Sequence, residues 1–199
     1  MLIKQFVDIP SCFITATDTD AGKTYISCQI LKAWKNQGLT VGAFKPIASG
    51  AIWQGGQLVS EDALELAKVT GQTLSEINPY TFEHPASPHI ADVDGQFNMS
   101  ECLDLFQQLN NKYDRVLVEG VGGWCVPLSE NLMLKDLAIA VQLPVVMVAR
   151  IGLGCINHSL LTIEKIKQDS DLYHGWIANV IEAEFTDIDS NIQAIVDRS

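Results

Sequence analysis

Two kinds of hydrophobic pattern alternate along this chain. Short, continuous apolar runs, typical of strands covered on both faces, stand at residues 12–16, 41–45, 115–119, 144–149 and 176–180. Between them, apolar residues recur every three or four positions, which predicts helices at residues 23–37, 61–69, 100–111, 134–141, 155–167 and 187–197. The alternation favours an α/β fold: one doubly wound, mostly parallel sheet with helices on both faces, in a single domain over residues 1–199.

Two segments interrupt the alternation. Residues 46–57 are rich in glycine and small side chains and are predicted to form a loop. Residues 78–95 hold three prolines and two histidines, and this stretch is too long for a simple connector, so we interpret it as a candidate functional loop. In such sheets ligands bind at the carboxyl ends of the strands. The polar residues that follow the apolar runs are therefore the first candidates for chemistry.

The segment between the first strand and the first helix carries the clearest signal. Gly22, Lys23 and Thr24 close a tight turn that opens a helix, which is the layout of a phosphate-binding loop of the P-loop NTPase type. Backbone N–H groups of such a loop point at phosphate oxygens, while the lysine supplies positive charge and the threonine hydroxyl binds Mg²⁺. A nucleoside triphosphate is the predicted ligand, although Thr17 and Ala16 stand where the usual pattern begins with glycine.

The net charge of the chain limits the classes of molecule that it is expected to bind. A net charge of −11 over 199 residues argues against a nucleic-acid partner. An acidic surface also repels a triphosphate, so positive charge has to be concentrated where the phosphates lie. Lys23 and Lys45 are the candidate cations, and a metal ion carried by the nucleotide would add to them.

Cysteine usage and hydropathy indicate a cytoplasmic protein. The five cysteines form no CxxC pair and no zinc spacing, so we interpret them as reduced thiols. No apolar run approaches the roughly 20 residues that cross a bilayer, and residues 1–5 are too short and polar to open a secretory signal. No membrane partner is expected.

Two carboxylates are candidate ligands of a nucleotide-bound magnesium ion. Glu119 closes an apolar strand, and Gly120 after it allows the backbone to approach a ligand closely. Asp62 stands in the first turn of a predicted helix. Each has a simpler interpretation, because a strand-end carboxylate can face water and the helix dipole favours an acid in a first turn. Beside Thr24, both become candidate metal ligands.

Three further features are candidate substrate contacts. Lys45 ends the second strand and could point a cation at the same crevice, although the position also suits a surface lysine. Ser49 offers a hydroxyl group. The glycine-rich turn at residues 152–157 offers N–H groups that suit a carboxylate, and it is equally compatible with an ordinary strand-to-helix connection.

These segments together resemble the dethiobiotin synthetase family of biotin synthesis. The most specific matches are Lys-Pro-Ile-Ala-Ser-Gly at residues 45–50 and Val-Glu-Gly-Val-Gly-Gly-Trp at residues 118–124. Other matches, at residues 17–24, 78–82, 87–90 and 153–158, follow in the family's order, and the resemblance covers about residues 10–182. It implies a homodimeric enzyme that uses ATP and Mg²⁺ to join carbon dioxide to a diamine carboxylate, 7,8-diaminopelargonic acid, through a carbamate and a carbamic–phosphoric anhydride.

The resemblance also assigns roles to residues. Lys23 and Lys45 would neutralise the transferred phosphoryl group, with Thr19 and Ser49 holding carbamate and phosphate oxygens. Magnesium would be held by Thr24, Asp62 and Glu119. The nucleotide site would comprise Asp20, Ala21, Gly22, Lys23, Thr24, Tyr25, Glu119 and Asn179, of which Asn179 would read the adenine edge. The substrate site would comprise Thr19, Lys45, Ser49 and Gly120, joined across the subunit interface by Gly154, Cys155, Ile156 and Asn157.

The chain departs from the family pattern in two places. Ala16 replaces a glycine, and we expect this to be harmless, because alanine would be strained only if the site needed a positive φ. The family usually continues beyond a chain of this length with a strand and a loop over the base. We therefore expect a more open base pocket, and the choice among ATP, GTP and CTP stays open.

Two other classes of function fit parts of the pattern. Nucleotide-switched ATPases of the partition and septum-placement type share the deviant loop and the sheet, but they usually carry an extra lysine early in the loop, which residues 16–19 lack. They also often end in a helix that binds a membrane or a partner, and the acidic residues 187–199 are poorly suited to an anionic membrane. A family member that binds nucleotide without turnover is the third alternative.

Overall fold

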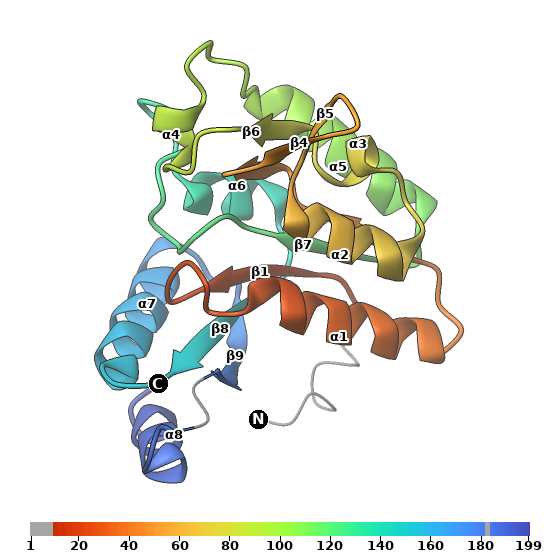
Figure 1. Ribbon diagram of the computed structural model, residues 1–199. Coiled ribbons are helices and arrows are strands. Elements are labelled where there is room, and N and C mark those ends of the chain that lie inside the picture. The colour runs from red at the N-terminus through yellow and green to blue at the C-terminus, as the bar shows by residue number, and fades with distance from the viewer. Residues whose placement is uncertain (1–9, 182–183) are drawn as a thin grey trace.

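A central parallel sheet organises the molecule. The structure, a computed structural model, describes residues 10–181 and 184–199, so the predictions for residues 1–5 and the resemblance at residue 182 lie outside the described residues. Within them the central sheet has the strand order β2-β7-β1-β8-β9 (Figure 1). Its strands are β1 (Cys12–Ala16), β2 (Val41–Phe44), β7 (Arg115–Glu119), β8 (Val145–Ile151) and β9 (Tyr173–Val180). All five predicted strands are confirmed, with small shifts of their ends.

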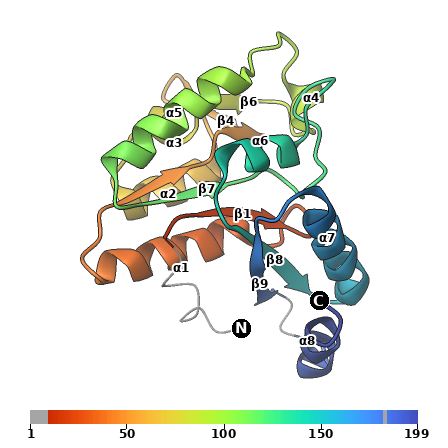
Figure 2. The same ribbon diagram turned by 180° about the vertical axis from the view of Figure 1, so that it is seen from behind.

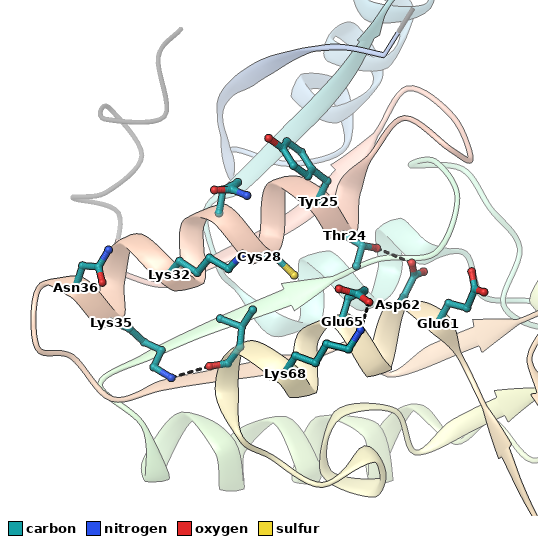
Figure 3. A pocket seen from close by; sticks show the side chains of 12 residues that line it. Thr24, Tyr25, Cys28, Lys32, Lys35, Asn36, Glu61, Asp62, Glu65 and Lys68 are labelled. Atoms are coloured by element: carbon teal, nitrogen blue, oxygen red, sulfur yellow. Dashed lines mark hydrogen bonds and ion pairs between the residues drawn. The ribbon is translucent and has the colours of Figure 1, made fainter. Parts of the chain in front are cut away.

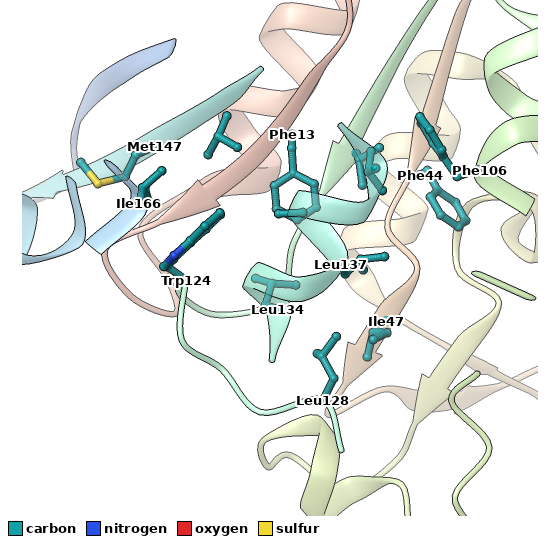
Figure 4. Packing of buried hydrophobic residues seen from close by; sticks show 14 of the residues in the cluster. Phe13, Phe44, Ile47, Phe106, Trp124, Leu128, Leu134, Leu137, Met147 and Ile166 are labelled. Atoms are coloured by element: carbon teal, nitrogen blue, oxygen red, sulfur yellow. The ribbon is translucent and has the colours of Figure 1, made fainter. Parts of the chain in front are cut away.

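Helices cover both faces of this sheet, because alternate side chains of each strand point to opposite faces. Ile14 and the other strand side chains on the same face pack against α1 (Lys23–Asn36), α2 (Glu61–Thr70) and α3 (Leu74–Ile77). Phe13 and the other side chains on the opposite face belong to a second core, whose buried side chains appear in Figure 4 and whose covering helices appear in Figure 2. That second core packs against α5 (Met99–Lys112), α6 (Leu134–Val141), α7 (Cys155–Asp169) and α8 (Ile188–Val196). The doubly wound arrangement is confirmed.

The first turns of α1 and α2 hold two of the predicted site residues, Thr24 and Asp62. In α1, the predicted apolar face is confirmed, since Ile26, Ile30 and Trp34 are buried against the sheet. The side chain of Ser60 accepts the N–H of Ala63 and so fixes the first turn of α2, where Asp62 lies. Both helices therefore begin at the carboxyl edge of the sheet with their first turns side by side (Figure 1).

The segment predicted as a loop at residues 46–57 contains strands, and that prediction is wrong. Here β3 (Ile47–Ser49) pairs with β6 (Tyr80–Phe82), and β4 (Ile52–Gln54) forms a hairpin with β5 (Gln57–Val59). Three-residue strands are too short to show a hydrophobic period. The Gly-Gly pair at 55–56, both with positive φ, is nevertheless a recognised signal for a two-residue hairpin turn.

The segment at residues 78–95 is less irregular than predicted, since it contains β6 and the short helix α4 (Pro88–Ala91). Asn78 stabilises its start: the side-chain amide donates to the carbonyl oxygens of Lys45, at 2.8 Å, and of Tyr80, at 3.2 Å. These bonds tie the end of β2 to the start of β6. Across residues 10–181 and 184–199, every helix is too short or too polar to cross a bilayer.

Candidate active site

The turn between β1 and α1 is shaped by two residues with positive φ. Gly22 has φ 84° and precedes the first residue of α1, and Asp20 has φ 56°, a conformation that aspartate tolerates better than most residues. Ala16 lies within β1 in an ordinary strand conformation. Ala16 has no positive φ, so alanine is unstrained at this position.

Gly22 is also the point where the turn meets β9. The side-chain amide of Asn179 donates to the carbonyl oxygen of Ala21 at 2.9 Å, and a Cβ atom at Gly22 would lie 2.0 Å from the same amide nitrogen. Only glycine fits both the backbone angle and this close approach. Asn179 thus supports the loop from the end of β9, two strands away from β1, a contact that the sequence pattern did not predict.

We expect Gly22→Ala to lower the free energy of unfolding by about 2–4 kcal/mol, because the backbone strain adds to the displacement of Asn179. Gly38→Ala is the matched control, since Gly38 has the same φ of 84° with nothing near its missing Cβ. The control should show the backbone strain alone, about 1–2 kcal/mol. Urea unfolding of both variants measures the difference, and equal losses would show that the Asn179 contact costs nothing.

The carboxylates predicted from the sequence converge on Thr24. The Thr24 hydroxyl lies 2.7 Å from Asp62 Oδ1 and 2.7 Å from Glu119 Oε1, and Figure 3 shows the first of these contacts. Lys45 Nζ lies 2.8 Å from Asp62 Oδ2 and 2.8 Å from Glu119 Oε1. Glu119 is fully buried, and the side chain of Lys45 is nearly so. The four side chains therefore form one cluster where β2 and β7 end and α1 and α2 begin, with Lys45 and Glu119 buried and the Asp62 side chain 45% exposed.

Electrostatics inside this cluster favour the ionised forms. Burial alone would lower the pKa of Lys45, but Glu119 and Asp62 outweigh it and raise that pKa to about 12. Burial would likewise raise the pKa of Asp62, but the charge of Lys45 outweighs this effect and holds that pKa below its usual value. Lys45 and Asp62 therefore stay charged at neutral pH.

Lys23 has the opposite environment. Its ammonium donates to the carbonyl oxygens of Gly122, at 2.8 Å, and Asp18, at 3.3 Å. Burial, with the nearby charge of Lys45 as the second cause, lowers the pKa of Lys23 to about 8. Lys23 is thus a buried cation whose contacts are carbonyl oxygens, and an anion placed beside it would be strongly favoured.

A cavity of ≈ 700 Å³ joins these groups. Most of the predicted polar site residues line it: Thr19, Asp20, Gly22, Lys23, Thr24, Lys45, Ser49 and Asp62. Most of the remaining lining residues are apolar, and we call them the apolar wall: Ala48, Pro85, Ala86, Pro88, Val121 and Val126. The cavity therefore combines a phosphate-binding turn and a charge cluster with a wall that suits an aliphatic ligand.

Residues 85–88, which form part of this wall, were not predicted individually. The Gly50 N–H donates to the carbonyl oxygen of His84 at 3.2 Å, and this bond places the proline-rich segment beside Ser49. Ser87 donates to the carbonyl oxygen of Pro127 at 3.2 Å. The sequence signal was the length and proline content of the segment, which predicted a functional loop without indicating which residues face the ligand.

Among the predicted site residues, Ala21, Glu119, Gly120 and Asn179 do not line this cavity, although Glu119 and Gly120 contact Thr24 and Lys45, which do. Tyr25 and the turn at residues 154–157 do not line it either.

Tyr25 lines a second groove of ≈ 680 Å³ between α1 and α2, which Cys28 and Lys32 also line (Figure 3). This groove adjoins the cavity, since Thr24 and Asp62 line both. Gly154, Cys155, Ile156 and Asn157 open α7, and among the described residues that line the cavity none comes from this turn. Their predicted contact with substrate would require a second subunit, and it stays a prediction.

The donor set fits a magnesium ion. Glu119 Oε2 is buried, and no partner for it occurs among residues 10–181 and 184–199. Such an oxygen is one that a cation can satisfy. The same residues contain no group of three or more His, Cys, Asp or Glu side chains that could enclose a metal. One or two carboxylates and a hydroxyl are what Mg²⁺ uses when phosphates and water supply its remaining ligands.

Similarity to known proteins is extensive in sequence. A family model described as an AAA domain matches residues 11–198. The ATP-dependent dethiobiotin synthetase BioD of Aromatoleum aromaticum is 37% identical over 187 residues, which are 92% of this chain and 83% of that protein. The protein of the same name from Cellvibrio japonicus is 40% identical over 194 residues, 94% of this chain and 83% of that protein.

Similarity to solved structures confirms the fold. The MinC:MinD cell division complex of Aquifex aeolicus matches with a TM-score of 0.55 at 15% identity, covering 94% of this chain and 77% of that one. The kinase domain of the Escherichia coli tyrosine kinase ETK also matches with a TM-score of 0.55, at 16% identity, over 89% of this chain and 69% of that one. At such identities the likeness establishes an α/β P-loop fold and nothing about activity.

Proposed function

Since this chain belongs to the ATP-dependent dethiobiotin synthetase family, we propose that it uses ATP to join carbon dioxide to 7,8-diaminopelargonic acid and close the ring of dethiobiotin. Family membership makes it an ATP-dependent ligase of biotin synthesis. The observation that supports the finer proposal is the shared cavity, which is lined by residues of a phosphate-binding turn, by two buried lysines and by the apolar wall.

The proposed reaction has three steps. One amine of the substrate attacks carbon dioxide and loses a proton, which gives a carbamate. A carbamate oxygen then attacks the γ-phosphorus of ATP, the bond to ADP breaks, and a carbamic–phosphoric anhydride forms. The second amine attacks the carbonyl carbon and loses a proton, and phosphate leaves. These steps depend on positioning and on neutralising negative charge more than on a strong acid or base.

The residues of the cavity suit these needs. Lys23 and Lys45 would neutralise charge on the transferred phosphoryl group, and N–H groups of residues 17–24 would hold its oxygens. Thr19 and Ser49 would hold carbamate and phosphate oxygens. Thr24, Asp62 and Glu119 would hold Mg²⁺, which when bound neutralises charge on the phosphates of ATP. The apolar wall would pack against the aliphatic chain of the diamine.

Contacts beyond this cavity complete the proposal. Asn179 would read the adenine edge from its position beside the loop, and Gly120, whose carbonyl lies 3.4 Å from Lys45 Nζ, would contact substrate. The turn that opens α7, residues 154–157, would bind the carboxylate of the substrate held by a second subunit through N–H groups of its first helical turn. Leu153 beside it is 97% exposed in one chain, which is compatible with a subunit interface.

The nucleotide-switch alternative has weaker support. The MinC:MinD complex and a ParA-family ATPase resemble this chain in fold at 15% and 13% identity. The dethiobiotin synthetases share 37–42% identity with it over most of its length. A switch would need no wall for an aliphatic substrate, whereas this cavity has one.

Phosphate release from ATP tests the proposed activity. We expect release to require both the diamine and bicarbonate, with dethiobiotin formed in equal amount. Release that neither compound stimulates would support a nucleotide switch instead. Nucleotide binding without phosphate release under any of these conditions would identify the non-catalytic family member.

Nucleotide affinity should depend on pH through Lys23. Its pKa of about 8 means that the ammonium loses its proton above that pH in the free protein. Phosphate oxygens favour the charged form, so binding takes up a proton there, and affinity should fall by up to about tenfold per pH unit above pH 8. Calorimetry of ATP binding between pH 7.5 and 9.5 measures this. Lys23→Arg should remove the dependence, and an unchanged affinity in the wild-type protein would contradict the assignment.

A further inference from the structure

We propose that Lys45 is an exchangeable cation, which holds Asp62 and Glu119 together in the nucleotide-free protein and releases them when a magnesium–nucleotide complex enters. The released ammonium then faces the substrate side of the cavity. This inference rests on the proposed function, because it takes Thr24, Asp62 and Glu119 as the groups that face the metal. It adds an order of events, since Lys45 reaches the substrate only after the metal has replaced it.

The first step of the argument is that the two carboxylates need a cation at all times. Both approach the Thr24 hydroxyl within 2.7 Å, so their charges converge on one point. Glu119 has no exposed surface, and the Asp62 side chain is 45% exposed. Like charges held this close, one of them out of water, are strongly unfavourable without a counter-ion. Lys45 supplies that counter-ion, at 2.8 Å from each carboxylate.

The second step is that the ammonium binds one oxygen of each carboxylate, which leaves Glu119 Oε2 as the oxygen without a partner among the described residues. Asp62 contacts Thr24 through Oδ1 and Lys45 through Oδ2, while Glu119 Oε1 contacts both Thr24 and Lys45. A divalent cation bound to these carboxylates would lie a few ångströms from the ammonium, where repulsion between like charges is severe. The two cations therefore compete for Asp62 and Glu119 rather than sharing them.

The third step is that Lys45 can move without disturbing the fold. Its N–H donates to the carbonyl oxygen of Ile77 at 2.9 Å, and its own carbonyl oxygen accepts from the Asn78 amide at 2.8 Å. The side chain, in contrast, lines the cavity that Ser49 also lines. With the backbone fixed at both sides, rotation about side-chain bonds is enough to carry the ammonium from the carboxylates toward a ligand in the cavity.

Metal binding without nucleotide or substrate tests the exchange. We would titrate the nucleotide-free protein with Mn²⁺ and follow the free ion by electron paramagnetic resonance. Removing the competing cation in Lys45→Met should tighten Mn²⁺ binding at least about tenfold, or roughly 1.4 kcal/mol. Lys68→Met is the matched control, because it removes the same charge from an exposed site on α2, and its affinity should equal that of the wild type.

The outcomes separate this inference from the proposed function. Binding by Lys45→Met that is no tighter than in Lys68→Met would overturn the exchange, even if the wild-type protein makes dethiobiotin. A wild-type protein that forms dethiobiotin without any divalent cation would instead overturn the metal role on which the inference rests. If Lys45→Met is unfolded without metal, refolding on addition of Mn²⁺ supports the exchange and failure to refold contradicts it. Lys45→Gln, which retains hydrogen-bond donors, provides the same titration in a milder variant.

Discussion

Lys23→Ala is expected to lower the rate of dethiobiotin formation by about 10²–10³-fold, the size of effect seen when one charge-stabilising donor is removed from an active site. The buried ammonium of Lys23 sits beside the carbonyl oxygens of Gly122 and Asp18, at the base of the proposed phosphate site. Without it, negative charge that develops during phosphoryl transfer loses one of its two nearby lysines. Steady-state formation of dethiobiotin at saturating ATP and diamine measures the loss.

Lys32→Ala is the control for this experiment. Lys32 lies on the same helix but is exposed, and it lines the groove between α1 and α2 rather than the cavity. The control should turn over like the wild-type protein. Full turnover by Lys23→Ala, with its circular dichroism spectrum unchanged, would remove Lys23 from the catalytic machinery.

Glu119→Gln is expected to raise the magnesium concentration needed for half-maximal activity by about 10–100-fold, because a neutral amide replaces a charged oxygen ligand. Glu119 is fully buried, and its Oε2 is the oxygen for which the described residues offer no partner. A magnesium titration of dethiobiotin formation measures the shift.

Glu61→Gln provides the comparison for Glu119→Gln. Glu61 is an exposed acid next to Asp62 on α2, so its replacement removes the same charge near the cluster without touching it. Its magnesium titration should match that of the wild-type protein. Overlapping titrations for Glu119→Gln and the wild type would take Glu119 out of the metal site.

Local patterns predicted the parts of the site that lie within one strand–turn–helix unit. The apolar run of β1, the Gly22-Lys23-Thr24 turn and the periodic α1 follow one another in sequence, so their geometry is determined by neighbouring residues. Glu119 was also predictable, since a carboxylate that ends a buried parallel strand lies at the ligand edge of the sheet. Short-range rules are sufficient for these elements.

Short-range sequence rules could not predict the contacts between segments that are distant in sequence. The amide of Asn179 supports Ala21 across 158 positions of sequence, and Lys45 pairs with Glu119 across 74 positions. Each residue was predicted to contact ligand, but the contacts they make with each other depend on the strand order β2-β7-β1-β8-β9. Tertiary packing determines which of these residues pair, and the spacing of residue types along the chain does not predict that packing.

The small strands were missed for a different reason. In β3 and β6, three residues each are held by pairing with one another and by the bonds that Asn78 makes, and too few positions alternate to give a pattern. The hairpin of β4 and β5 did carry a local signal, the Gly-Gly pair at 55–56. A two-residue turn at that pair predicts a hairpin within the segment that the composition indicates as a loop.

The most direct test of the account is a crystal structure with Mg²⁺ and a non-hydrolysable ATP analogue. We expect the β- and γ-phosphates to accept hydrogen bonds from N–H groups of residues 17–24 and from Lys23. Mg²⁺ should contact Thr24, Asp62 and Glu119, with the ammonium of Lys45 no longer bound to either carboxylate. Phosphates in the groove beside Tyr25 and Lys32, or anywhere else away from the turn before α1, would contradict the account.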